Sequence, residues 1–343
     1  MTTTDWTVED ARALRAEVNA QRTRHARLKR LARPAVHAGY RVARLITRGG
    51  SDQRVMHKAA ARMNSNQTSA FDGYSPRQGD VVVSAYFKAG TNWVMHICHQ
   101  IAHLGQAEFE HIQDVIPWPD AAQPRFWINL NDPLPYHSPT GLRVIKSHLP
   151  ANLVPNRSAA RYVAVTRDPK DCAASGYPFF NRLLFGPASP PPDPWLAFCS
   201  SEHAICGPWS QHAASWYARR DEPNVLFLHY EDIKREPADT IDTLAAFLGV
   251  TLDAPAREQV IARTDFAAMK ADNHKFYPVN QSVWSSRGGA IIRAGRVGDS
   301  ATLFSAAARR QCDTRIASQL AKLDSQFPYH ARYGQQTDAE PLA

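Results

Sequence analysis

The sequence predicts an α/β fold with a central parallel sheet flanked by helices. Apolar stretches of strand length alternate with segments of helical periodicity along most of the chain, an order typical of parallel strands joined by helices. The sharpest example is the valine-rich stretch 81–83, which leads through a glycine loop into a helical pattern. We expect one domain over residues 75–330, preceded by a basic helical extension at 1–74 and followed by a polar tail at 331–343.

Composition limits the kinds of partner and compartment. The 343 residues can bury a full core, and the net charge of +8 suits a phosphate-rich cofactor, nucleic acid or an acidic membrane surface. The five cysteines are odd in number and lack Cys-x-x-Cys spacing, which predicts reduced thiols and no zinc-type site. Neither a signal-peptide pattern nor an apolar run of about 20 residues is present, so we expect a cytoplasmic protein.

The N-terminal extension has the pattern of a basic helix. It runs from about residue 8 to 48, with Asp5 and Thr7 as candidate caps and Pro34 as an expected break. Nine Arg or Lys residues and no acidic ones lie between residues 21 and 50, interleaved with apolar side chains. Residues 22–48 could therefore contact a membrane surface peripherally. We favour the alternative, a solvated helix packed on the main domain.

The stretch from Val81 to Trp93 reads as a strand, a tight loop and the start of a helix. Gly90 allows a sharp turn and a close backbone approach to a ligand. Unpaired N–H groups at the helix N-terminus suit a phosphate, and Lys88 adds a positive charge. The lysine precedes the glycine, so this is not a Walker A loop.

Later elements follow the same alternation. We expect strands at 142–150, 161–167 and 225–230, and helices at 169–180, 195–219 and 240–248, the last ended by Gly249. Polar, aromatic or proline-rich stretches at 63–77, 115–137 and 183–194 are expected to be irregular, the second as a pocket wall and the third as a candidate lid.

Three segments together resemble the cytosolic-type sulfotransferases, which use 3′-phosphoadenosine-5′-phosphosulfate (PAPS). Lys88-Ala89-Gly90-Thr91-Asn92-Trp93 resembles the 5′-phosphosulfate loop of that family. The segment from Arg167 to Ser175 resembles its 3′-phosphate segment, and Lys146-Ser147-His148-Leu149-Pro150 resembles the segment that carries its catalytic histidine. The resemblance covers about residues 75 to 325 in the order of the family.

The resemblance extends to the C-terminal part of the chain and implies further cofactor contacts. Residues 263–270 and 293–299 are similar to the family segments Phe-x-x-Met-Lys and Arg-Lys-Gly-x-x-Gly-Asp, although Ala294 replaces a lysine. Tyr230 would bind adenine beside Trp93. The implied cofactor-binding residues are Lys88, Ala89, Gly90, Thr91, Asn92, Trp93, Arg167, Ser175, Tyr230, Thr264, Phe266, Met269, Arg293, Ala294 and Gly295.

The resemblance implies a P-loop-NTPase-like fold and sulfuryl transfer from PAPS to a hydroxyl or amine. His148 would be the general base, a role that suits a neutral imidazole. Lys88 would stabilise the leaving phosphate, Lys146 would hold the transferring group, and Ser175 would restrain Lys88. We expect no metal, because lysines neutralise the charge, and no nucleic-acid partner.

The acceptor is expected to be a small apolar or aromatic molecule. The candidate pocket aromatics are Trp118, Phe126, Trp127, Phe179, Phe180, Phe185, Trp195, Phe276, Tyr277 and Trp284. A family-type homodimer is doubtful, because Ser300 stands where the family has tryptophan, and Ala301, Ser305, Ala306 and Arg310 occupy its key positions. The alternatives are a non-catalytic nucleotide- or membrane-surface-binding protein and, less favoured, an ATP-dependent kinase.

Overall fold

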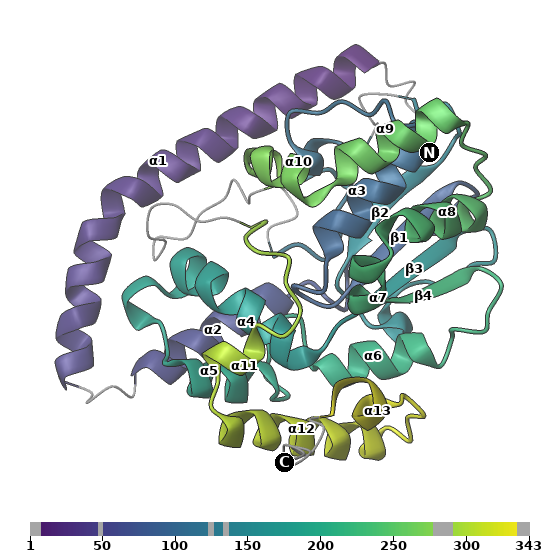
Figure 1. Ribbon diagram of the computed structural model, residues 1–343. Helices are drawn as coiled ribbons and strands as arrows, with labels where there is room; N and C mark the ends of the chain where they lie inside the picture. The colour runs from purple at the N-terminus through teal and green to yellow at the C-terminus, as the bar shows by residue number, and fades with distance from the viewer. Residues whose placement is uncertain (1–7, 47–50, 123–126, 133–136, 277–290, 335–343) are drawn as a thin grey trace.

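A four-stranded parallel sheet forms the centre of the computed structural model, which describes residues 8–46, 51–122, 127–132, 137–276 and 291–334 (Figure 1). The strands are β1 (Asp80–Ala85), β2 (Arg143–Ser147), β3 (Arg161–Thr166) and β4 (Val225–His229). Their spatial order is β2-β1-β3-β4, and all three pairings are parallel. The expected parallel α/β sheet is confirmed.

The strand register brings the predicted site residues to one edge. Val83 of β1 pairs with Lys146 of β2 and with Val163 of β3, so the carboxyl ends of the strands lie level. Lys88, His148, Arg167 and Tyr230 all follow these ends within three residues. In open α/β sheets this edge is where ligands bind.

The two faces of the sheet bury different cores. Val81, Val83 and Ala85 point into the larger core, together with residues of α3 (Thr91–Ala102). Val82 points to the other face and packs in a cluster with Trp216 of α6 (Trp209–Tyr217). This alternation follows from the period of two of a strand, and it explains why all six β1 residues are buried.

The remaining helices complete the layers on both sides of the sheet (Figure 1). They are α4 (Pro169–Phe180), α5 (Pro192–Cys199), α7 (Tyr230–Arg235), α8 (Pro237–Leu248), α9 (Ala254–Thr264), α10 (Phe266–Ala271), α11 (Ser300–Leu303), α12 (Ala306–Lys322) and α13 (Tyr329–Tyr333). Helix α8 ends at Gly249 in the left-handed conformation, as expected.

The single helix expected over 195–219 is wrong. The chain forms α5 and then α6, with a turn at Cys206 and Gly207, both of which have positive φ. Pro208 explains the break, because the residue before a proline is pushed away from helical geometry. The proline-rich segment before α5 contains short helical turns at Asn181–Phe185 and Gly186–Ala188 rather than an open loop.

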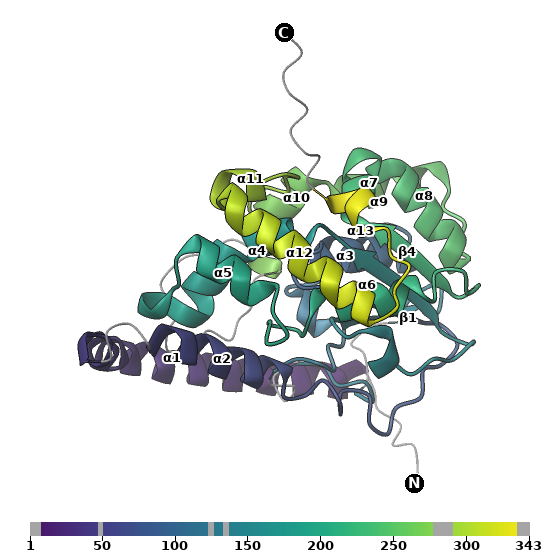
Figure 2. The ribbon, with the colours of Figure 1, turned by 90° about the horizontal axis from the view of Figure 1, so that it is seen from below.

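The N-terminal extension forms α1 (Val8–Ile46) and α2 (Ser51–Asn64), which diverge from the end of α1 (Figure 1) and both lie on one border of the molecule (Figure 2). The expected break at Pro34 is wrong, because α1 continues through this residue. The helix as a whole is bent (Figure 1). A proline removes one helical hydrogen bond and kinks the axis, which a long exposed helix can accommodate.

Buried arginines anchor α1 to the domain. Arg22 donates to Asp114 at 2.9 Å and lies 4.9 Å from the ring centre of Trp127, and Arg15 pairs with Asp132 at 2.9 Å. Part of the basic face is therefore structural, which agrees with a helix packed on the domain. Within the described residues, no helix combines the length and apolarity needed to cross a bilayer.

Candidate active site

One cavity of about 790 Å³ collects most of the predicted site residues at the carboxyl edge of the sheet. The predicted residues that line it are Lys88, Gly90, Thr91, Asn92, Trp93, Lys146, His148, Arg167, Ser175, Tyr230, Phe266, Met269, Arg293, Ala294 and Gly295. Ala89 and Thr264 are buried beside the cavity and do not line it.

The loop between β1 and α3 keeps its backbone close to the ligand space. Gly90 has φ 94°, and a Cβ atom added to it would lie 2.7 Å from Cδ2 of Tyr230. Only glycine fits both conditions. The N–H of Ala89 donates to Tyr86 O at 3.0 Å, so this donor closes the turn and is not available to a phosphate. The α3 N-terminus has no side-chain cap, which leaves its first N–H groups facing the cavity edge.

The Lys88 side chain lies in the cavity, where its surroundings favour the neutral amine over the ammonium. Its ammonium donates to Ile291 O at 3.3 Å and lies 4.6 Å from the ring centre of Phe179. Burial, together with the charges of Arg167 and Arg293, lowers the pKa of Lys88 to about 7. Ser175 lines the same cavity, but the hydrogen bond shown for the Lys88 ammonium goes to Ile291. An anionic ligand would restore the charged form.

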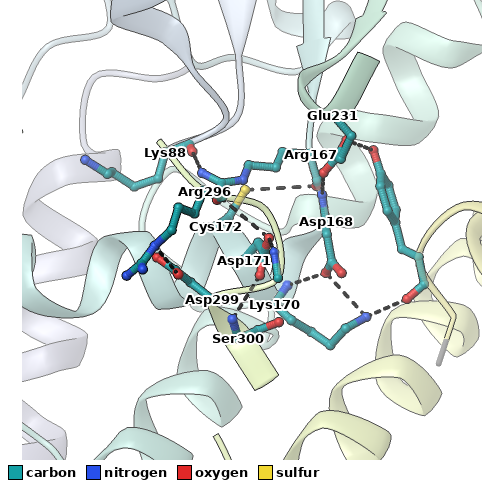
Figure 3. Close-up of polar contacts among 12 residues, drawn as sticks. Lys88, Arg167, Asp168, Lys170, Asp171, Cys172, Glu231, Arg296, Asp299 and Ser300 are labelled. Atoms are coloured by element: carbon teal, nitrogen blue, oxygen red, sulfur yellow. Dashed lines mark hydrogen bonds and ion pairs between the residues drawn. The ribbon is translucent and has the colours of Figure 1, made fainter. Parts of the chain in front are cut away.

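Arg167 contacts three segments of the cavity lining, which carry Lys88, Arg296 and Tyr230 and which we call the cradle. Figure 3 shows Arg167 with Lys88 and Arg296. Arg167 donates to Lys88 O at 3.1 Å and to Arg296 O at 2.8 Å, and its guanidinium lies 4.3 Å from the ring centre of Tyr230. Asp171 lies 3.6 Å away and also accepts from the N–H of Ser300 at 3.0 Å. The Nε of Arg167 is buried and has no partner among the described residues, as expected for a donor that awaits an anion.

His148 is held in a single tautomer. Its Nδ1 lies 2.6 Å from Ala85 O, and because a carbonyl only accepts, Nδ1 carries the proton and Nε2 is left as a proton acceptor. Burial and the charge of Lys146 lower the pKa of His148 to about 3. The ring is therefore neutral at physiological pH.

Asp120 is a candidate site residue that sequence reasoning missed. Its Oδ2 accepts from the His148 backbone N–H at 3.0 Å, while its Oδ1 is buried with no partner among the described residues. Burial raises the pKa of Asp120, and burial lowers the pKa of Lys146 to about 8 although the Asp120 charge opposes this. Its position in the irregular stretch 115–137, two residues after Trp118, was the only available signal.

The neighbouring ring of Trp118 completes this corner of the cavity. The Lys146 ammonium lies 3.5 Å from its centre, and the His148 ring meets it edge-on at 5.5 Å. A desolvated ammonium over an aromatic face gains a cation–π contact. Lys146, Trp118 and His148 thus hold one another in fixed positions.

Trp93 and Tyr230 form the aromatic end of the cradle. Their ring centres are 6.0 Å apart at 71°, and Trp93 Nε1 donates to Thr264 O at 2.9 Å. The Thr264 hydroxyl donates to Val260 O within its own helix, so Thr264 supports Trp93 through its carbonyl. A Cβ on Gly295 would lie 2.7 Å from the Phe266 ring, so this backbone also passes close to the site.

The expected aromatic pocket is only partly formed as predicted. Trp118, Trp127, Phe179, Phe180 and Phe276 line the cavity. Phe185 and Trp195 are fully buried and pack on each other with ring centres 5.8 Å apart, so they belong to the core. Phe126, Tyr277 and Trp284 lie outside the described residues.

Cationic and glycine-rich groups, rather than metal ligands, define the chemistry of the cavity. In the described part of the chain, no cluster of three or more His, Cys, Asp or Glu could hold a metal ion. His96 and His99 are buried beside Phe109, and all five cysteines are buried free thiols. The unpartnered Arg167 Nε and the two close glycine backbones fit a phosphorylated nucleotide.

A parallel sheet that ends in such a site defines an α/β protein that binds a phosphorylated nucleotide at the carboxyl edge of its strands. Residues 78–324 match the family model of the sulfotransferase domain, and the chain therefore belongs to the sulfotransferase family. It is 28% identical to human Sulfotransferase 1C2 over 262 residues, which cover 71% of this chain and 84% of that protein. It is 27% identical to human Sulfotransferase 2A1 over 262 residues, which cover 75% and 90%.

Solved structures that contain PAP share the fold. Mouse sulfotransferase SULT7A1 complexed with PAP aligns with a TM-score of 0.59 and 20% identity, covering 77% of this chain and 91% of that one. Retinol dehydratase in a complex with retinol and PAP aligns with a TM-score of 0.59 and 22% identity, covering 78% and 88%. This protein is a PAPS-dependent sulfotransferase.

Proposed function

We propose that His148 is the general base that activates the acceptor for sulfuryl transfer. The hydrogen bond from Nδ1 to Ala85 O carries this proposal, because it leaves Nε2 as the proton acceptor of the ring. A neutral imidazole fixed in this tautomer can take a proton from a hydroxyl or an amine. Burial and the charge of Lys146 lower the pKa of His148 to about 3, so the imidazole is neutral and able to accept a proton at physiological pH.

The cationic groups of the cavity are proposed to stabilise charge around the reaction. PAPS supplies the activated sulfuryl group when it is bound. Lys88 places its charge at the 5′-phosphate end of the cradle, and Lys146 places a second one beside His148. Arg167, Arg293 and the Gly295 backbone are suited to the 3′-phosphate, and Trp93 and Tyr230 to the adenine ring. Such fixed charges in a buried site lower the cost of charge development in the transition state.

The acceptor is proposed to be a small apolar or aromatic alcohol, phenol or lipid. Aromatic side chains form its side of the cavity, and Lys58 and Arg62 of α2 add positive charge to the outer wall. A basic wall disfavours a cationic molecule. Related structures with retinol and with androsterone support a ligand of this size and polarity.

The test is to separate turnover from nucleotide binding in His148→Ala. We expect kcat to fall by about 10²- to 10⁴-fold, the usual contribution of a general base, while the Kd for PAP stays within about twofold. His25→Ala, on the surface of α1, is the control and should match the parent enzyme. An active His148→Ala enzyme would show that another group removes the proton.

A further inference from the structure

The outward side of α1 carries an apolar stripe that the fold does not use. Five of the seven large hydrophobic side chains that are exposed in the described residues lie on this helix, with Leu31 76% and Leu45 82% exposed. The outer stripe consists of Leu28, Leu31, Ala35, Ala38, Val42 and Leu45. These positions alternate in steps of three and four, so they form one line along the helix.

The opposite face of α1 does the packing. Val18, Arg22 and Tyr40 are buried on that side, and Lys29 lines the active-site cavity. In Figure 2, α1 and α2 form one border of the molecule, with the other helices and the sheet all to one side of them. One face of α1 is therefore packed on the domain and borders the cavity through Lys29, and the outer stripe lies on the opposite face.

Basic side chains flank the stripe. Arg24, Arg27, Arg30 and Arg41 are exposed on α1, and residues 21–50 contain no Asp or Glu. Arg27 and Arg41 each immediately precede a stripe residue. Arginine side chains in this position can extend to headgroups while the apolar residues enter the acyl boundary.

We propose that an anionic lipid surface covers the outer stripe, with α1 lying flat in the membrane interface. A second copy of the chain is a poorer occupant, since pairing two such helices would place arginines against arginines with no carboxylate between them. A bilayer that contains acidic lipids supplies both the negative charge and the apolar environment. The proposal does not depend on the role of His148.

Vesicle sedimentation of the full-length protein tests the proposal. We expect binding to phosphatidylcholine vesicles that contain about one third phosphatidylglycerol, binding at least about tenfold weaker to pure phosphatidylcholine, and release as salt rises from roughly 0.1 to 0.5 M. Equal affinity for both vesicle types, or binding to neither, would overturn it.

Two surface variants separate the two contributions. Leu31→Gln/Leu45→Gln removes apolar area and keeps charge, and Arg27→Gln/Arg41→Gln does the reverse. Each should weaken binding to the acidic vesicles by about tenfold or more. The matched controls are Leu323→Gln, just after α12, and Arg310→Gln/Lys322→Gln on α12, and both should bind like the parent protein.

All variants alter exposed positions, and unchanged PAP affinity verifies that each is folded. Sedimentation velocity without lipid measures the oligomeric state and so tests whether a second copy of the chain covers the outer stripe. A monomer supports the proposal, whereas a dimer that Leu31→Gln/Leu45→Gln dissociates would assign the stripe to a second copy and overturn it.

Discussion

Lys88 shows how burial sets the chemistry of a single residue. It adopts φ 62°, an uncommon conformation for a side chain with a Cβ, and its pKa is lowered to about 7 mainly by burial. The strained backbone places the ammonium inside the cavity, where charge is costly until an anion arrives. The loop between β1 and α3 therefore favours the binding of anionic ligands.

Nucleotide affinity should consequently depend on pH. Above pH 7 the free enzyme has a neutral Lys88, and binding of anionic PAP must take up a proton, so affinity should fall as pH rises from 7 to 9. Titration calorimetry in buffers of different ionisation enthalpy measures the uptake. Lys88→Arg, which stays charged, should lose most of the uptake and flatten the profile. An identical uptake in Lys88→Arg would assign the effect elsewhere.

Asp120 is predicted to act as a positioning residue behind Lys146 and His148. Asp120→Asn keeps an acceptor for the His148 N–H but removes the charge that raises the pKa of Lys146. We expect the basic limb of kcat/KM to move to lower pH, with the Kd for PAP within about twofold.

Asp120→Ala separates the backbone contact from the charge. It also loses the contact to the His148 N–H, so kcat should fall by a further tenfold or so. If both variants keep the parent pH profile, Asp120 has only a packing role.

At the scale of elements, the attachment of α1 depends on a few buried ionic contacts. Arg22 is almost fully buried and donates to Asn19 at 2.7 Å as well as to Asp114. Removing one partner of a buried pair leaves an uncompensated charge, which costs about 3–5 kcal/mol.

Arg22→Met should therefore loosen α1 from the domain. Amide hydrogen exchange across α1 should become faster, whereas exchange in β1 and β3 should not change. Arg24→Met, two residues away and exposed, is the matched control. Unchanged exchange in Arg22→Met would mean that apolar packing at Val18 and Tyr40 suffices to hold the helix.

At the scale of the whole molecule, one network ties distant parts of the chain to the cradle. Arg167 contacts the β1 loop and Arg296 (Figure 3). Lys170 in the same segment donates to Asp313 of α12 and to Tyr333 O of α13. Ligands that occupy this network should stabilise the entire domain, because its parts unfold together.

PAP should therefore raise the melting temperature more than 5′-AMP, which lacks the 3′-phosphate. At a hundredfold its Kd, PAP adds about 2.7 kcal/mol, or a few degrees for a chain of this size. Arg167→Ala should remove most of the difference between the two nucleotides. Equal shifts for PAP and 5′-AMP in the parent protein would contradict the assignment of the 3′-phosphate to this cluster.

The sequence by itself determined the sheet, its parallel strands and most of the cavity lining. Strand patterns and Gly90 are local features that steric and hydrophobic rules are enough to interpret. The segments around His148 and Arg167 are identified by their resemblance to those of the sulfotransferase family. Parallel strands then bring their ends together, so Lys88, His148 and Arg167 meet at one edge even though they are far apart in sequence.

Only the tertiary structure decided the contacts that cross between segments. Asp120 lies in an irregular stretch whose path has no period, Phe185 and Trp195 lie in the core rather than in the pocket, and α1 runs through Pro34. The same structure decided which side of α1 faces outward, because Arg15 and Arg22 find carboxylates on the domain. These outcomes depend on which distant groups are available as partners, and a linear pattern does not contain that information.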